Sequence, residues 1–225
     1  MKVKDFTPSI TSSLDLWALN RSKIITVNSE IYLSYFVDKV CSSEGFLTTL
    51  DSKFIYNYIT NKKIRNTFEP LSGSDILIST LEHAQVNDLN VVIYGGSPHD
   101  QSLNQLAIKQ RYPTLKVSLQ SIEVFECGAL KDGSIIDRNT LSQAHFIFAA
   151  LGSPKQENFI RFHEKEFSDN YIFAMGIGGG LDFITGRETR SPLWLRKIGG
   201  EWTWRILQNP KRVIRLIRAL RILFH

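Results

Sequence analysis

The 225-residue sequence contains only two cysteines, Cys41 and Cys127, and they lack the short spacing of a zinc site. This scarcity excludes a disulfide-dense secreted scaffold and indicates free thiols in a reducing compartment. The first ten residues, MKVKDFTPSI, lack the apolar core of a secretory signal. No uninterrupted apolar segment approaches the roughly 20 residues needed to span a bilayer. We therefore expect a cytoplasmic protein without a membrane-spanning helix.

Candidate metal ligands are also sparse. The five histidines are scattered, and the sequence has no Asp-x-Asp pair, a common device for holding a metal-bound nucleotide. His145 stands in an apolar run, which favours a buried position inside a strand over a ligand role. The sequence therefore predicts a protein that needs no metal cofactor.

Basic residues are concentrated near the end of the sequence. Residues 187–225 carry ten Lys or Arg against two Glu, a net charge of +8, whereas the whole chain has +5. At about 100° per residue, five apolar side chains of the last segment share one helical face. They are Ile206, Val213, Ile217, Leu220 and Phe224. We favour a membrane-surface helix over docking on the body, and divide the chain into a body, 1–190, and a helical membrane-associating appendage, 191–225.

Short apolar runs alternate with longer amphipathic segments through the body. Strands are expected at 23–27, 46–50, 91–94, 115–119, 145–151 and 172–175, and helices at 29–40, 52–60, 75–85, 98–111, 138–142, 154–167, 192–207 and 210–224. Alternation of this kind is typical of parallel βαβ units. We predict an α/β fold: a Rossmann-like, mostly parallel sheet with flanking helices and a basic amphipathic helical C-terminal appendage.

The stretch from 144 to 160, AHFIFAALGSPKQENFI, is the centre of the predicted site. Its apolar run predicts a buried strand, which Gly152 ends. Ser153 is expected to cap a helix that begins at Pro154. Lys155–Glu157 then lie at the carboxyl end of the strand, where open α/β sheets bind ligands. The simpler alternative is a capped turn with three solvated polar residues.

Polar residues and glycines follow other predicted strands. Asp51 follows the second strand, and Thr26 and Asn28 stand at the end of the first. A carboxylate at such an edge can accept the proton of an attacking hydroxyl. The structural alternatives are helix capping by Asp51 or Asn28 and strand packing by Thr26. The glycines at 95–96 and 176–180 let backbone N–H groups approach a phosphate.

Several motifs occur in the order found in a known family. They are TVN at Thr26–Asn28, GSD at Gly73–Asp75, YGG at Tyr94–Gly96, LGSPKQE at Leu151–Glu157, GGGLDFITG at Gly178–Gly186, RSPLW at Arg190–Trp194, EWTWR at Glu201–Arg205 and PKRVIR at Pro210–Arg215. On these motifs the chain resembles the bacterial WecG/TagA/CpsF glycosyltransferase family, from about Ile24 to Arg215.

The resemblance implies a function. It implies an inverting, metal-independent glycosyltransferase that moves a sugar from a UDP-sugar. The sugar expected from the resemblance is N-acetylmannosamine. The implied acceptor is a polyprenyl-diphosphate-linked saccharide at the inner face of the cell membrane. The product would serve teichoic acid, capsule, exopolysaccharide or another surface polysaccharide.

The resemblance also implies roles for single residues. Asp51 matches the proposed general base of the family, although Ser52 stands where the family usually has glycine. Gln156 is the second expected catalytic residue, because its amide can donate and accept hydrogen bonds, which suits a sugar or a departing phosphate. Substrate binding is expected from Thr26, Asn28, Gly73, Gly95, Gly96, Gly152, Lys155, Gly179 and Asp182, the last through a ribose hydroxyl or else as a cap.

One position departs from the family pattern. Pro70 stands where the family tends to have an arginine before the GSD motif. We therefore expect Arg190, Arg205 or Arg212 to neutralise the pyrophosphate of the donor. Lipid contact or simple solvation is the alternative for these arginines.

Two other functions remain open at this point. A dinucleotide-dependent oxidoreductase would use the glycines at 176–180, but Leu181 stands where G-x-G-x-x-G needs glycine. A nucleic-acid-binding protein would use the basic tail, but residues 1–186 are mildly acidic and carry polar groups at strand ends. We expect no nucleic acid partner, and the sequence leaves a homo-oligomer possible.

Overall fold

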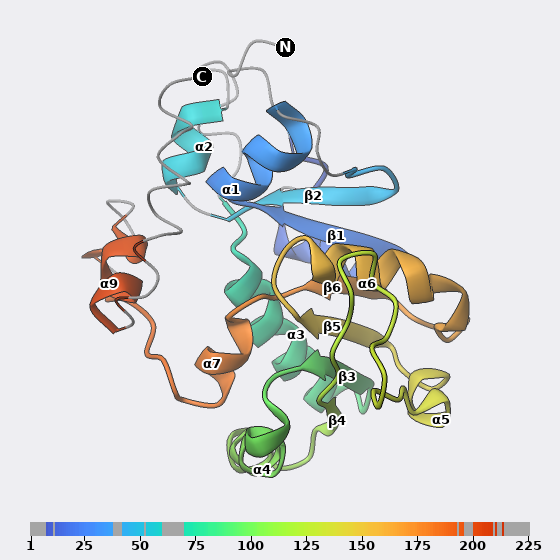
Figure 1. Cartoon of the computed structure of the whole chain (residues 1–225). Helices are drawn as coiled ribbons and strands as arrows, with labels where there is room; N and C mark the ends of the chain where they lie inside the picture. The colour runs from blue at the N-terminus through green and yellow to red at the C-terminus, as the bar shows by residue number, and fades with distance from the viewer. Residues whose placement is uncertain are drawn as a thin grey trace.

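Six strands form one open sheet in the computed structural model. The structure describes residues 8–10, 12–37, 42–51, 53–59, 70–192, 194–195, 200–208, 210 and 213. The strands are β1 (Ser22–Val27), β2 (Phe46–Leu50), β3 (Asn90–Gly95), β4 (Lys116–Gln120), β5 (Phe146–Ala150) and β6 (Phe173–Gly176). All pairs are parallel, in the order β2-β1-β6-β5-β3-β4 (Figure 1). The predicted α/β fold with a parallel sheet is confirmed.

Helices cover both faces of the sheet. They are α1 (Ser29–Ile31), α2 (Lys53–Ile59), α3 (Gly73–Val86), α4 (Gln101–Arg111), α5 (Arg138–Leu141), α6 (Lys155–His163), α7 (Gly180–Ile184) and α9 (Glu201–Gln208). A π-helical segment, Tyr32–Val37, continues α1, and short 3₁₀ turns occur at Ser13–Ala18, Pro98–Asp100 and Glu164–Glu166. Side chains of α1, α2 and α6 pack in one core, and those of α3, α4 and α7 pack in the other.

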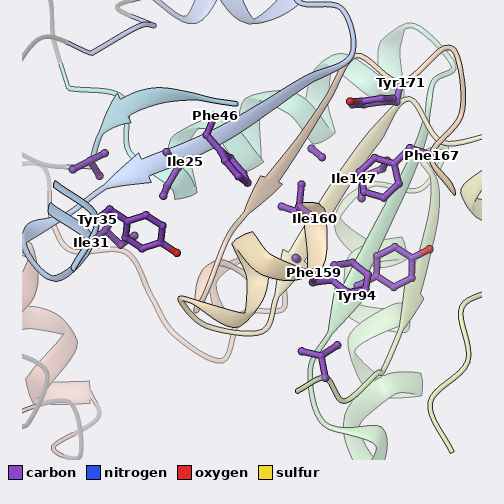
Figure 2. Close-up of a cluster of buried hydrophobic side chains, with 14 of the residues drawn as sticks. Ile25, Ile31, Tyr35, Phe46, Tyr94, Ile147, Phe159, Ile160, Phe167 and Tyr171 are labelled. Atoms are coloured by element: carbon purple, nitrogen blue, oxygen red, sulfur yellow. The ribbon is translucent and has the colours of Figure 1, made fainter. Parts of the chain in front are cut away.

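Alternating strand residues supply the two cores. Val92 and Tyr94 of β3 join the core under α6, whereas Val91 and Ile93 join the core under α3. None of the four is more than 1% exposed, because side chains alternate along a strand and both faces of a parallel sheet are covered. Figure 2 shows the first core, where Phe159 of α6 lies beside Tyr94.

The order of the strands marks one edge of the sheet as the place for a ligand. Neighbouring strands β3 and β5 are followed by α4 and α6, which pack on opposite faces. Neighbours β1 and β6 are likewise followed by α1 and α7 on opposite faces. In open α/β sheets, ligands bind outside the carboxyl ends of such strands.

Among the predicted elements of the body, the strand at 145–151 and the helix at 29–40 differ in the structure. His145 lies just before β5 and is half-buried, and its Nδ1 accepts the backbone N–H of Asn90 at 3.1 Å at the start of β3. The helix expected at 29–40 begins at Ser29 but becomes π-helical at Tyr32. Residues 38–40 lie outside the described part of the chain.

The predicted appendage is described only in part. The helix expected over 192–207 is interrupted at Gly200, whose N–H closes a turn with the carbonyl of Leu195 at 2.8 Å before α9 begins. Of the predicted apolar face, Val213 is 43% exposed and Ile206 is half-buried. Ile217, Leu220 and Phe224 lie outside the described residues. Among the described helices, none is long and apolar enough to cross a bilayer.

The end of the body is tied to α9 by hydrogen bonds. The carbonyl of Thr189 accepts Trp204 Nε1 at 3.0 Å and Gln208 Nε2 at 2.9 Å. The N–H of Thr189 donates to Gln208 Oε1 at 2.8 Å. The division at 190 and 191 stays a prediction.

Candidate functional site

Asp51 lies at the carboxyl edge of the sheet, directly after β2. Its backbone N–H donates to the carbonyl of Val27 at 3.0 Å, which extends the β1–β2 ladder by one bond. Its Oδ1 accepts the backbone N–H of Gly73 at 3.2 Å. Gly73 is the first residue of α3, so the half-buried carboxylate is held between the end of β1 and the start of that helix.

Thr26 lies beneath the start of the same helix. Its hydroxyl donates to Met175 Sδ at 3.7 Å and so joins β1 to β6. A Cβ on Gly73 would lie 3.4 Å from Thr26 Oγ1, in ordinary van der Waals contact, so the start of α3 lies close to this strand. Three predicted site residues, Asp51, Thr26 and Gly73, are therefore brought together from separate parts of the chain.

Asn28 caps a helix. Its Oδ1 accepts the N–H of Ile31 at 2.9 Å, at the N-terminus of α1. The structural alternative expected for this residue is therefore confirmed, and its contact with substrate stays a prediction.

The predicted glycines lie after neighbouring strands. Gly95 ends β3 with a φ of +116°, and Gly152 follows β5 with a φ of +75°. Left-handed backbone is readily adopted by glycine and is costly for residues with a Cβ. Gly96 continues the β3 turn, and Gly179 stands at the N-cap of α7. These turns lie at the strand ends that the sheet order marks for a ligand.

The α6 turn differs from the prediction. The helix begins at Lys155 with Pro154 at the N-cap, and no side chain caps it. The Ser153–Pro154 peptide is cis. Lys155 Nζ lies 3.6 Å from Glu126 Oε1 at the surface. Gln156 and Glu157, however, are only 5% and 1% exposed, so the alternative of three solvated residues was wrong.

The two buried side chains belong to a hydrogen-bonded chain. Gln156 Oε1 accepts the N–H of Gly178 at 2.9 Å, and its Nε2 donates to Glu157 Oε1 at 2.7 Å. The Tyr35 hydroxyl donates to Glu157 Oε2 at 3.2 Å. Burial raises the pKa of Glu157, and hydrogen bonds, that from Gln156 foremost, act in the opposite direction.

The sequence analysis gave no role to Tyr35 or Glu157. A usable signal was the helical spacing of α6, because Glu157 lies three residues before the buried Ile160. Tyr35 gave no comparable signal, since its contact with Glu157 spans 122 residues.

Acidic partners hold two arginines near the site. Arg190 Nη1 lies 2.5 Å from Asp75 Oδ1, in the first turn of α3, which also begins with Gly73. Arg187 lies 2.7 Å from Asp100 and 3.3 Å from Asp182, so the predicted ribose ligand is part of an ion pair. The side chains of Arg205 and Arg212 lie outside the described residues. Within the described residues, no three His, Cys, Asp or Glu side chains gather as a metal site.

Comparison with known proteins gives matches of two kinds. The "Glycosyl transferase WecG/TagA/CpsF family" profile matches residues 3–225. Proteins from Staphylococcus aureus strains MW2 and NCTC 8325 / PS 47, both named N-acetylglucosaminyldiphosphoundecaprenol N-acetyl-beta-D-mannosaminyltransferase, are 32% identical over 146 residues. That match covers 65% of this chain and 55% of each relative. The chain thus spans little more than half the length of these relatives.

Proposed function

The chain belongs to the WecG/TagA/CpsF family of glycosyltransferases, and on this basis we propose that it transfers N-acetylmannosamine from a UDP-sugar to a lipid-linked saccharide. The names of the relatives support undecaprenyl-diphosphate-linked N-acetylglucosamine as the acceptor. The product would enter the synthesis of a teichoic acid or another surface polysaccharide. The observation that carries the proposal is the Asp51 carboxylate, held at the carboxyl edge of the sheet by the first N–H of α3.

In the proposed reaction, Asp51 is the general base. It accepts the proton of the acceptor hydroxyl as that oxygen attacks the anomeric carbon. The bond from this carbon to the UDP oxygen breaks in the same displacement, so the configuration inverts. The hydrogen bond from Gly73 keeps the carboxylate oriented at the edge where both substrates would meet.

The leaving diphosphate needs positive charge or N–H donors. The turns at Gly95–Gly96 and Gly152 can bring backbone N–H groups close to phosphate oxygens. Arg190 is one candidate for this role, because its partner Asp75 is two residues from Gly73 at the start of α3. Donors placed where charge develops stabilise the transition state.

A direct assay tests this function. The protein is incubated with UDP-N-acetylmannosamine and a short-chain prenyl-diphosphate N-acetylglucosamine, and the disaccharide product is detected by mass spectrometry. UDP-N-acetylglucosamine and UDP-glucose serve as alternative donors. Transfer from one of these but not from UDP-N-acetylmannosamine would replace the proposed sugar, and no transfer from any would contradict the proposed function.

UDP is expected to bind without a divalent metal. The expectation rests on the missing Asp-x-Asp pair and on the surplus of arginines after residue 186. Titration calorimetry should therefore give the same Kd for UDP with EDTA and with added Mn²⁺. Binding that disappears with EDTA and returns with Mn²⁺ would show that the site needs a metal.

The basic tail is proposed to hold the protein on the inner membrane face, where a prenyl-linked acceptor resides. Each basic residue near an anionic surface contributes about 1 kcal/mol. Replacing Arg215, Arg218 and Arg221 with glutamine should therefore weaken binding to anionic vesicles by about 100-fold. The control replaces Lys109, Lys131 and Lys165 of the body, and vesicle sedimentation measures both. Equal losses would contradict a specific role for the tail.

A further inference from the structure

We propose that Glu157 is a positioning residue for the transfer reaction: it orients the Gln156 amide and thereby holds the glycine loop after β6 in place. The proposal rests on the proposed glycosyltransferase function and adds to it a residue that does not contact substrate. It is carried by one continuous chain of hydrogen bonds, Tyr35–Glu157–Gln156–Gly178.

This chain joins three separate connections of the sheet. Tyr35 comes from the π-helical segment after β1, the strand that pairs with β2 and ends beside Asp51. Glu157 and Gln156 come from the first turn of α6, after β5. Gly178 lies in the loop between β6 and α7. In Figure 2 the Tyr35 hydroxyl points from its segment toward α6.

Glu157 determines which way the Gln156 amide faces. The two ends of a glutamine amide are different, since the oxygen accepts and the nitrogen donates. Glu157 Oε1 takes the Nε2 donor at 2.7 Å, which leaves Oε1 of Gln156 to accept the N–H of Gly178 at 2.9 Å. Without an acceptor at residue 157, a reversed amide would place a donor against the Gly178 N–H and break that bond.

The Gln156 side chain packs against the backbone of β6. A Cβ on Gly176, the last residue of β6, would lie 2.4 Å from Gln156 Nε2 and 2.5 Å from its Cδ. Gln156 therefore lies directly on the glycine backbone. Its burial makes an unmet hydrogen bond expensive, so amide orientation and loop position are coupled.

The loop held in this way lies at the edge proposed for the donor. Gly178 is followed by Gly179 at the start of α7, and Asp182 is in that helix. A shift of about 1 Å in groups that place a substrate can cost about 10²-fold in rate. Loss of Glu157 should therefore reduce turnover although this residue is 1% exposed.

Hydrogen exchange at Gly178 tests the positioning role without any reaction. In Glu157→Met, which has no acceptor, the Gly178 amide should exchange at least about 10-fold faster. In Glu157→Gln, whose carbonyl still accepts, it should remain protected. The control amide is Ile177, whose N–H donates to the carbonyl of Ala149 at 2.8 Å and should not change. Unchanged exchange of Gly178 in Glu157→Met would overturn the proposal.

A double-mutant cycle tests the catalytic consequence. Glu157→Met should lower kcat about 10- to 100-fold with a smaller change in KM, whereas Glu157→Gln should restore most of the rate. In a Gln156→Ala background, Glu157→Met should add little, because it acts through Gln156. Independent, multiplicative losses would overturn the proposal.

Tyr35→Phe covers the case in which Glu157→Met does not fold. It removes only the hydroxyl donor and should speed exchange at Gly178 by a smaller factor than Glu157→Met. No change at Gly178 in Tyr35→Phe would show that Tyr35 is not part of this chain of hydrogen bonds.

A wild-type protein with a protected Gly178 amide but no transferase activity would contradict the proposed function. It would leave the role of Glu157 in positioning the loop unaffected.

Discussion

Asp51→Asn is expected to lower kcat for sugar transfer by about 10²–10⁴-fold, the usual contribution of a general base. The amide cannot accept the proton of the acceptor hydroxyl. Its oxygen can still accept the N–H of Gly73, which Asp51 Oδ1 accepts at 3.2 Å. The variant should therefore fold normally and bind UDP with nearly unchanged affinity. Initial rates with the lipid-linked acceptor and calorimetry with UDP measure the two effects.

Asp169→Asn is the matched control for this substitution. Asp169 is an exposed aspartate whose side chain is 90% accessible and pairs with Arg21 at the surface. It should transfer sugar at the wild-type rate. A folded Asp51→Asn protein that also turns over at the wild-type rate would exclude Asp51 as the base.

Gly95→Ala is expected to reduce the free energy of unfolding by about 2–5 kcal/mol, from left-handed strain and overpacking together. Gly95 has a φ of +116°, and a Cβ there would lie 2.5 Å from the carbonyl oxygen of Ala150. The position of a Cβ is fixed by its own backbone and the neighbouring atom is a backbone carbonyl oxygen, so no side-chain rotation relieves the contact. Relief requires the ends of β3 and β5 to separate, which would also displace the turn at Gly152. Chemical denaturation measures the loss.

Gly133→Ala separates the two contributions. Gly133 has a similar positive φ of +81°, but a Cβ there would have nothing within 4 Å. It should lose only about 1 kcal/mol, the cost of left-handed backbone. Equal losses at the two positions would show that the close approach to Ala150 adds nothing.

Local patterns in the sequence determined the elements and the candidate edge. Apolar β-branched runs such as Lys23–Val27 predicted strands, because side chains of a strand repeat every two residues and both faces of a parallel sheet are buried. The position of Asp51 directly after such a run predicted its place at the carboxyl edge. The motifs predicted the family, which the profile match over residues 3–225 confirms.

The tertiary structure decided which of these strand ends meet and which polar residues are buried. Periodicity carries no information on strand order, so the contact of Asp51 with Gly73 and the pairing of Arg190 with Asp75 were not predictable from spacing. Glu157 shows the limit most clearly. A glutamate in a first helical turn is usually solvated, and only the packing of Tyr35 and Gln156 around it makes burial tolerable, since a buried acid requires hydrogen-bond partners.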